Sequence, residues 1–203
     1  MTTFYFVRHG VTAHTGHKLT GWMEGVSLTD EGREQAERAA ESLADLDLEA
    51  IYSSPIDRTR ETAEIVARPH RLKVRFSRGI GEVGYGAWTG RSLKVLARTK
   101  IWATLQQWPS SVRFPEGDTL REVQVRAVEE IERLCETHPK GRVCVVSHAD
   151  TIKLVLAHYM GIHLDLFQRL VIAPASVSVL HVSDHGPQIL SLNALPAPRP
   201  RRR

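Results

Sequence analysis

The sequence has few cysteines and no long hydrophobic run. Its two cysteines, Cys135 and Cys144, are too few for a disulfide framework and lack the spacing of a metal site, which fits a reducing cytosol. No apolar stretch approaches the ~20 residues that a membrane-spanning helix needs. Arg8 and His9 come too early for a secretory signal with a charged leader and an apolar segment. We therefore expect a soluble, cytoplasmic protein with no membrane partner.

The body of the chain also has no excess of charge of either sign. The net charge is +4, and the final stretch LPAPRPRRR contains Arg199, Arg201, Arg202 and Arg203. Without these four, the 27 lysines and arginines fall to 23, which equals the number of aspartates and glutamates. Because its prolines exclude a helix or a central strand, we expect residues 196–203 to be a disordered, solvated tail. A tail that binds nucleic acid is the less favoured alternative, so we expect no nucleic-acid partner.

Strand and helix patterns alternate along the chain. Apolar stretches predict strands over residues 3–8, 49–54, 72–77 and 142–147. Amphipathic patterns, with Thr29, Ser54 and Thr119 as N-caps of the first three, predict helices over 30–46, 55–68, 120–138 and 150–161. RLVIAP, SVSVLHVS and QILSLN predict a strand-rich end. We therefore expect one α/β domain over residues 1–195, a three-layer α/β/α fold with a mostly parallel central sheet and an antiparallel edge.

Charged and polar residues follow several of the predicted strands. Arg8-His9-Gly10 ends the first strand, Arg58 lies one turn into the next helix, and Ser147-His148-Ala149 follows a strongly apolar strand. Open α/β sheets bind ligands at the carboxyl ends of their strands. The two arginines keep their charge, and each offers a planar fork of donors that matches phosphate or carboxylate oxygens. The pattern predicts a site for a multiply charged anion.

The histidines and one glutamate can add chemistry to such an anion site. One histidine can act as a nucleophile through a neutral ring nitrogen, while the other donates hydrogen bonds to the oxyanions. Glu82, in the glycine-rich loop 79–90, is poorly suited to bind an anion but well suited to protonate a leaving-group oxygen. Glu24 and Glu116 also lie in glycine-containing loops and are the alternatives for this role.

Four motifs in order resemble the histidine phosphatase (phosphoglycerate-mutase-like) superfamily, in particular its bacterial broad-specificity phosphatase branch. They are VRHG, YSSPIDRTRETA, GEVGYGAWTG and VVSHA, and the match spans residues 4 to about 160. The resemblance implies that residues 1–195 form the catalytic domain of a phosphomonoester hydrolase. It implies a cofactor-independent phosphatase that hydrolyses a small phosphomonoester, a small phosphorylated metabolite, through a phosphohistidine intermediate.

The same resemblance implies roles for individual residues of this chain. His9 is similar to the family's nucleophile, Glu82 to its general acid and base, and Arg8, Arg58 and His148 to its phosphate pocket. Further contacts with phosphate or substrate are implied for Ala149, Thr20, Gly21 and Thr15. Thr15 stands where the family often has asparagine, and His14 competes for that place.

The resemblance covers mutases as well as phosphatases. The segment between Glu82 and residue 119 lacks the long insertion and the Arg/His/Tyr pattern that the resemblance associates with mutases, so we favour the phosphatase. A non-catalytic phosphate-binding protein is the third alternative, and the presence of His9 and Glu82 disfavours it. No metal or other cofactor is implied, because the fixed cations supply the electrostatic work. We expect specificity to reside in loops 14–26 and 83–114, and leave the oligomeric state open, with a homodimer as one alternative.

Overall fold

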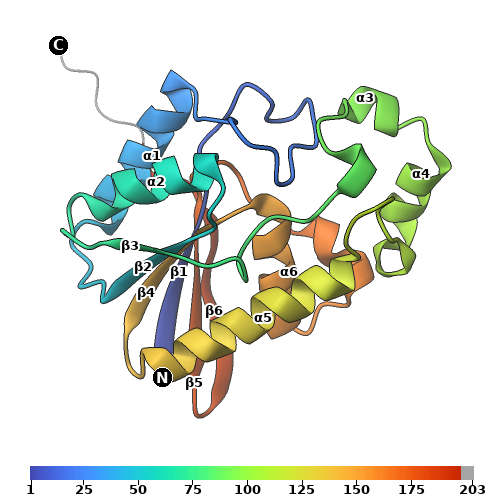
Figure 1. Ribbon diagram of the computed structural model, residues 1–203. Coiled ribbons are helices and arrows are strands. Elements are labelled where there is room, and N and C mark those ends of the chain that lie inside the picture. Colours follow the sequence, from blue (N-terminus) through green and yellow to red (C-terminus); the bar gives the residue numbers. More distant parts are fainter. Residues whose placement is uncertain (198–203) are drawn as a thin grey trace.

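The computed structural model describes residues 1–197, and these residues contain a six-stranded mixed sheet (Figure 1). The strands lie in the order β3-β2-β4-β1-β5-β6. Their bounds are Thr2–Arg8 for β1, Ala50–Ser53 for β2, Val74–Phe76 for β3, Arg142–Ser147 for β4, Val177–Ser183 for β5 and Gly186–Ala194 for β6. Strands β3, β2, β4 and β1 pair in parallel, whereas β5 pairs antiparallel with β1 and β6 antiparallel with β5. The predicted α/β fold, with a mostly parallel sheet and an antiparallel edge, is confirmed.

Helices cover both faces of the sheet, as the three-layer prediction requires. One face packs against α1 (Asp30–Leu43) and α2 (Asp57–Ala67), and the other against α5 (Leu120–Thr137) and α6 (Ala149–Tyr159) (Figure 1). The alternation of side chains along β1 produces the two cores, since Phe4 and Phe6 join the α5/α6 core whereas Val7 joins the α1/α2 core. A strand covered on both faces is apolar on both, which is why residues 4–7 form an unbroken apolar and aromatic run.

Short helices form the region between β3 and α5. They are η1 (Gly86–Trp88), α3 (Leu93–Leu96), α4 (Lys100–Gln107) and η2 (Pro109–Ser111), and a further 3-10 helix, η3 (Leu164–Arg169), follows α6. The segment 89–93 is hydrogen-bonded to the segment 17–19, which comes from the loop after β1. The bonds run from the Gly90 N–H to the Leu19 carbonyl, from the Leu19 N–H to the Arg91 carbonyl and from the Leu93 N–H to the His17 carbonyl. We call this pair of segments the loop ribbon.

Helix caps explain where two of the long helices begin. The Thr29 side chain accepts a hydrogen bond from the Gly32 N–H, and Thr119 forms a capping box with Glu122, so both predicted N-caps are confirmed. The predicted cap at Ser54 is wrong. Helix α2 begins at Asp57, because Ile56 is extended (ψ 140°) and ends the helical conformation there. The Ser54 hydroxyl accepts a long hydrogen bond from the Ile56 N–H at 3.5 Å and is bonded to His148 Nε2 at 2.9 Å.

Two strand predictions also need correction. RLVIAP forms no strand, because its backbone groups bond to side chains: the Ile172 carbonyl accepts from Arg8 Nη1, and the Ala173 N–H donates to Asn193 Oδ1. The strand predicted over 72–77 is reduced to Val74–Phe76 at the edge of the sheet. The predicted tail over 196–203 lies, from residue 198 onward, outside the described residues.

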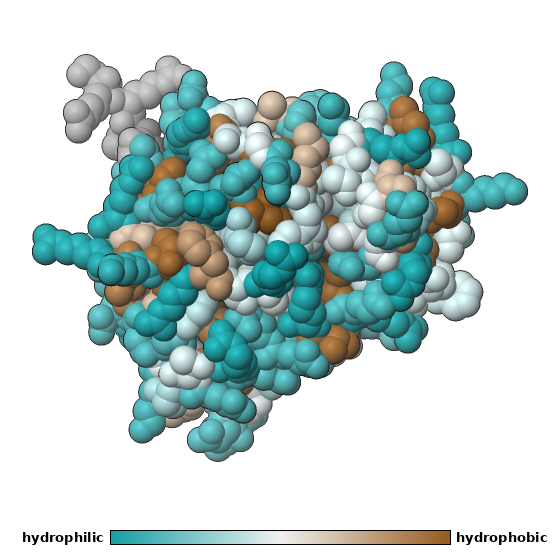
Figure 2. All heavy atoms as spheres, in the orientation of Figure 1, coloured by the Kyte–Doolittle hydropathy of each residue, from teal (hydrophilic) through white to brown (hydrophobic). Residues whose placement is uncertain are grey.

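Apolar regions are short in the helices of residues 1–197 and small on the face drawn in Figure 2. Within residues 1–197, no helix combines the length and the apolar character that crossing a bilayer requires. Figure 2 shows a mostly hydrophilic face with hydrophobic residues scattered in small groups. This face therefore presents no large apolar patch of the kind that marks a docking surface.

The register of the sheet brings three strand ends together. Arg8 pairs with Ser147 across β1 and β4, and Ser53 pairs with Val146 across β2 and β4. The residues that immediately follow these strands therefore meet at one edge of the sheet.

A contact between two backbone segments fixes the loop after β1. Gly32, in the first turn of α1, lies so close to Val11 that an added Cβ would collide with the Val11 carbonyl oxygen. A Cβ added at Gly10 would likewise collide with the Gly32 carbonyl oxygen. The loop that carries His9 is therefore packed backbone to backbone against α1.

Substitution of Gly32 by alanine should destabilise the protein by about 1–3 kcal/mol, the usual cost of overpacking. An ordinary helix-interior Gly→Ala change stabilises by up to about 1 kcal/mol, so the expected sign is opposite to that of helix propensity. Urea unfolding measures the change in the free energy of unfolding. The control is Ser42→Ala on the exposed side of the same helix, which should change this free energy by no more than about 0.5 kcal/mol. A stabilised Gly32→Ala variant would contradict the packing argument.

Candidate active site

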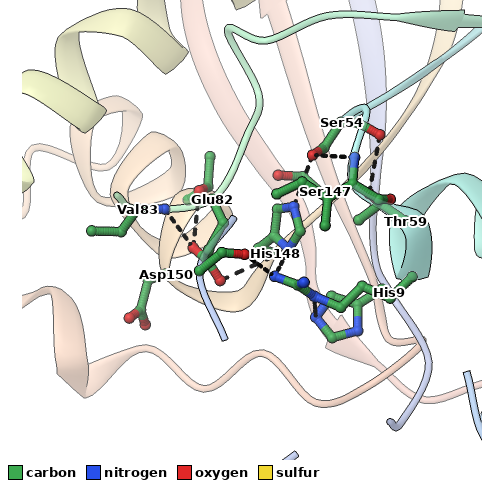
Figure 3. Close-up of polar contacts among 12 residues, drawn as sticks. His9, Ser54, Thr59, Glu82, Val83, Ser147, His148 and Asp150 are labelled. Carbon is green, nitrogen blue, oxygen red and sulfur yellow. Dashed lines mark hydrogen bonds and ion pairs between the residues drawn. The ribbon is translucent and has the colours of Figure 1, made fainter. Parts of the chain in front are cut away.

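A cavity of about 180 Å³ lies where the strand ends meet. Its lining includes Arg8 at the end of β1, His9 directly after it, Glu82, and Asp150 at the start of α6. Pockets for drug-sized ligands measure about 300–1,000 Å³, so a cavity of this size suits a small molecule. Arg58 and His148 do not line this cavity, but Arg58 is hydrogen-bonded to His9, which does, and to His148. Figure 3 shows His9, His148 and Glu82 together.

The His9 imidazole is held in one orientation, with its proton on Nδ1 and an unprotonated Nε2. Its Nδ1 lies 2.8 Å from the Gly10 carbonyl oxygen, which can only accept, so Nδ1 carries the proton. The other nitrogen, Nε2, accepts from Arg58 Nε at 3.3 Å. Burial, with the charges of Arg58 and Arg8, holds the pKa of His9 well below its ordinary value. A neutral ring with its electron pair on Nε2 has the form of a nucleophile.

Arg58 connects the two histidines. Its side chain is 1% exposed and donates through Nη2 to the Gly21 carbonyl at 2.8 Å and to His148 Nδ1 at 3.1 Å. Its Nη1 is buried and has no hydrogen-bond partner among the described residues. A buried guanidinium donor without a partner is rare and calls for a ligand or an ordered water.

Arg8 presents a second incompletely bonded guanidinium. Its Nη1 donates to the Ile172 carbonyl at 2.7 Å, while its Nε is buried without a partner in the described part of the chain. Burial lowers the pKa of Arg8 from its ordinary value, but a guanidinium remains charged at neutral pH. The cavity therefore carries a fixed positive charge next to His9.

His148 is fully buried and neutral. Its Nδ1 accepts from Arg58, so its Nε2 carries the proton and donates to the Ser54 hydroxyl at 2.9 Å. Burial and the charge of Arg58 hold its pKa well below the ordinary value. Figure 3 shows the ring between Ser54 and Glu82, and its centroid lies 5.3 Å from that of His9. In this arrangement His148 orients Arg58, and the predicted hydrogen bond from His148 to an oxyanion would require it to exchange partners.

Glu82 is a buried carboxyl group on the cavity wall. Its Oε1 accepts from the Val83 N–H at 3.0 Å, and its Oε2 lies 3.8 Å from His148 Nδ1. Its main-chain carbonyl accepts from Trp22 Nε1 at 2.7 Å, which fixes the backbone that bears it. Burial, followed by the negative charge of Asp150, raises the pKa of Glu82 to about 7. A carboxyl group with this pKa is about half protonated at neutral pH and can donate its proton.

The remaining predicted contacts are only partly brought to the cavity. Thr20, Ala149, Thr15 and His14 all line it, and the Thr15 hydroxyl also accepts from the Thr12 N–H at 2.9 Å. Gly21 does not line the cavity and instead bonds Arg58 through its carbonyl. Both candidates for the usual asparagine position therefore reach the cavity.

Sequence reasoning missed several residues of this site. Tyr85 lines the cavity and donates to Asp150 Oδ2 at 3.0 Å, and Thr151 donates to Glu82 Oε1 at 3.4 Å. Asp150 directly follows the VVSHA motif, which is the one signal that could have drawn attention to it. Ser54 was recognisable as a polar residue after β2, but its hydrogen bond to a histidine 94 residues away was not.

The alternatives to Glu82 lie elsewhere. Glu24 belongs to a larger hollow of about 490 Å³, whose other lining residues include Trp22, Arg60 and Arg78 and none of the five residues predicted as catalytic. Glu116 adopts a positive φ of 58° in the turn before α5 and does not line the smaller cavity. Within the described part of the chain, no group of three or more histidine, cysteine or acidic side chains is arranged to hold a metal ion.

A family model and individual relatives both match this chain over most of its length. Residues 4–195 match the family described as histidine phosphatase superfamily (branch 1). The chain is 30% identical over 199 residues to phosphoserine phosphatase 1 of Hydrogenobacter thermophilus, covering 95% of this chain and 92% of that protein. It is 26% identical to a probable phosphoglycerate mutase, GpmB, of Erwinia tasmaniensis, covering 88% and 84% of the two chains.

The solved structures agree with this result. YhfR of Bacillus stearothermophilus superposes with a TM-score of 0.88 at 26% identity, covering 96% of this chain and 98% of that one. Because the family match extends over nearly the whole described chain, the protein belongs to the histidine phosphatase superfamily, branch 1.

Proposed function

We propose that the protein is a cofactor-independent phosphatase that hydrolyses a small phosphomonoester through a phosphohistidine on His9. The observation that carries the proposal is the unprotonated Nε2 of a neutral His9, next to two guanidinium groups that each keep a buried, unpartnered donor. Arg8 and Arg58 would each bond phosphate oxygens through these donors. The small cavity supports a small phosphorylated metabolite as the substrate.

In the first step, His9 Nε2 attacks the phosphorus atom from the side opposite the leaving oxygen. The N–P bond forms as the P–O bond breaks, and the electron pair of that bond goes to the leaving oxygen. Glu82 donates its proton to this oxygen, so a neutral alcohol departs and Glu82 becomes a carboxylate. The fixed charges of Arg8 and Arg58 stabilise the negative charge on the transferring group throughout.

In the second step, the phosphoryl group passes to water. The Glu82 carboxylate takes a proton from a water molecule as its oxygen attacks phosphorus, and the N–P bond breaks with its electron pair returning to Nε2. Inorganic phosphate is released, and both His9 and Glu82 regain their starting forms. The pKa of about 7 for Glu82 suits both roles, since a group titrating near neutral pH can donate and accept.

A mutase is the second candidate, and the names of the relatives favour keeping it. One relative is named a phosphoserine phosphatase and another a probable phosphoglycerate mutase. A mutase would return the phosphoryl group to its substrate rather than to water. The absence of a long insertion between Glu82 and α5 supports the phosphatase. The third alternative, a non-catalytic phosphate-binding protein, is disfavoured because His9 and Glu82 both line the cavity.

Two assays on one enzyme preparation separate these candidates. We expect release of inorganic phosphate from a panel of phosphorylated metabolites, including phosphoserine, sugar phosphates and phosphoglycerates. Isomerisation of 3-phosphoglycerate, measured with and without a bisphosphate primer, should be at most about one hundredth of the best phosphatase rate. Isomerisation faster than phosphate release would establish the mutase. A protein that shows neither isomerisation nor phosphate release would favour the non-catalytic alternative.

A further inference from the structure

Asp150 places a carboxylate in the wall of a cavity that is otherwise suited to an anion. It lies in the first turn of α6, two residues after His148, and lines the same cavity as His9 and Glu82. A phosphate dianion gains nothing from a neighbouring negative charge. The carboxylate therefore needs an explanation other than phosphate binding.

The Asp150 carboxylate is held in place but keeps capacity for a ligand. Its Oδ2 accepts from the Tyr85 hydroxyl at 3.0 Å, and its Oδ1 accepts from Lys153 Nζ at 3.2 Å. An ionised carboxylate has about four lone-pair sites, of which these contacts use two. Its side chain is 30% exposed, so the free sites are not sealed inside the core.

Its position relative to Glu82 indicates which part of a substrate it would meet. In Figure 3, Asp150 lies on the side of Glu82 away from His9. The two carboxyl groups line the same cavity, and the negative charge of Asp150 adds to burial in raising the pKa of Glu82. In the proposed reaction the leaving oxygen must reach Glu82. Atoms one or two bonds beyond that oxygen then lie near Asp150.

We propose that Asp150 selects the alcohol part of the substrate, favouring phosphate esters that carry an ammonium or hydroxyl group on the carbon next to the ester carbon. A carboxylate at the same position is disfavoured, because two anions in a partly buried cavity repel each other. This proposal rests on the proposed phosphatase function and adds a substrate class to it. Tyr85 and Lys153 act as positioning residues, since they hold the carboxylate in its place.

The test uses four phosphate esters of similar size. They are 2-aminoethyl, 2-hydroxyethyl, n-propyl and carboxymethyl phosphate, which differ mainly in the group at the position that Asp150 would contact. The readout is the ratio of kcat/KM for the aminoethyl ester to that for the carboxymethyl ester. Asp150→Asn also changes the pKa of Glu82, but a change in the general acid affects both esters in the same direction. Lys18 and His14, which also line the cavity, remain in place in every variant.

The ratio should fall at least about tenfold in Asp150→Asn, the size expected when one charge-assisted hydrogen bond is lost. Tyr85→Phe, which removes one of the two groups that hold the carboxylate, should lower the ratio several-fold and serves as a second variant if the first does not fold. Asp184→Asn, in the exposed turn between β5 and β6, is the matched control and should leave the ratio unchanged.

The outcomes distinguish this inference from the proposed function. Unchanged ratios in both Asp150→Asn and Tyr85→Phe, with all four esters still hydrolysed, would overturn the inference and leave the phosphatase standing. A wild-type protein that hydrolyses neither these esters nor p-nitrophenyl phosphate would overturn the phosphatase, and the inference with it.

Discussion

Replacement of His9 by alanine should reduce hydrolysis of p-nitrophenyl phosphate by about 10⁴-fold or more, as expected when a nucleophile is removed. His148 is poorly placed to substitute for it, because it is fully buried, does not line the cavity and carries its ring proton on the Nε2 that donates to Ser54. The expected loss is therefore in kcat, because the phosphate-binding arginines remain.

A trapping experiment distinguishes loss of the nucleophile from general damage. Rapid mixing of wild-type enzyme with radiolabelled substrate, followed by quenching, should yield a protein-bound phosphate that is stable to base and lost in acid. His9→Ala should yield none. His185→Ala, in the exposed turn between β5 and β6, is the matched control and should be labelled like the wild type. Substantial activity in His9→Ala, or a label on another residue, would disprove the mechanism.

The pH dependence of kcat/KM for alkyl phosphates should be bell-shaped, with the alkaline limb set by Glu82. Glu82 must be protonated to donate, and its pKa is raised to about 7, so the rate should fall as the pH rises through about 7. His9 must be neutral to attack, and its pKa lies well below its ordinary value, so the acid limb should appear only well below pH 6.5. Measurements of kcat/KM between about pH 5 and pH 9 test whether the rate falls on the alkaline side near pH 7 and whether it persists on the acid side below pH 6.5.

Glu82→Gln should remove the alkaline limb and lower the rate on alkyl phosphates by about 10²–10⁴-fold. Glutamine keeps an oxygen for the Val83 N–H but cannot supply the proton. The loss should be much smaller on p-nitrophenyl phosphate, whose leaving group needs little protonation. Glu24→Gln and Glu116→Gln, at the two alternative acids, should resemble the wild type on both substrates. Equal losses of the Glu82 variant on both substrates would argue against a role as general acid.

The frame of the site could be predicted from the sequence because it depends on local patterns. A strand buried on both faces leaves an unbroken apolar run, so β1 and β4 and the residues after them, His9 and His148, were located without structural knowledge. Parallel strands align their carboxyl ends, which explains why the predicted residues meet. The caps at Thr29 and Thr119 were found for the same reason, since a cap involves residues only three apart.

The parts that were mispredicted depend on contacts between distant segments. Ser54 fits a helix cap by its position, but the helix begins three residues later and the serine hydroxyl makes its shorter hydrogen bond to His148. RLVIAP has the composition of a strand, but the Ile172 carbonyl is used by Arg8, 164 residues away in sequence. The link between Tyr85 and Asp150 joins residues 65 positions apart, and no short motif encodes it. Local propensity cannot predict such contacts, because the tertiary fold decides which partners are in reach.

The loop ribbon has a consequence for how substrate preference could be altered in this protein. Three backbone hydrogen bonds join residues 17–19 to residues 89–93, and Leu19 and Leu93, one from each segment, both line the cavity. A graft that exchanges only one of these segments for that of another enzyme would break the pairing and leave main-chain donors and acceptors unmatched. The two segments form a single module, although about 70 residues separate them in the chain. Redesign or recombination aimed at new substrates should therefore transfer both together.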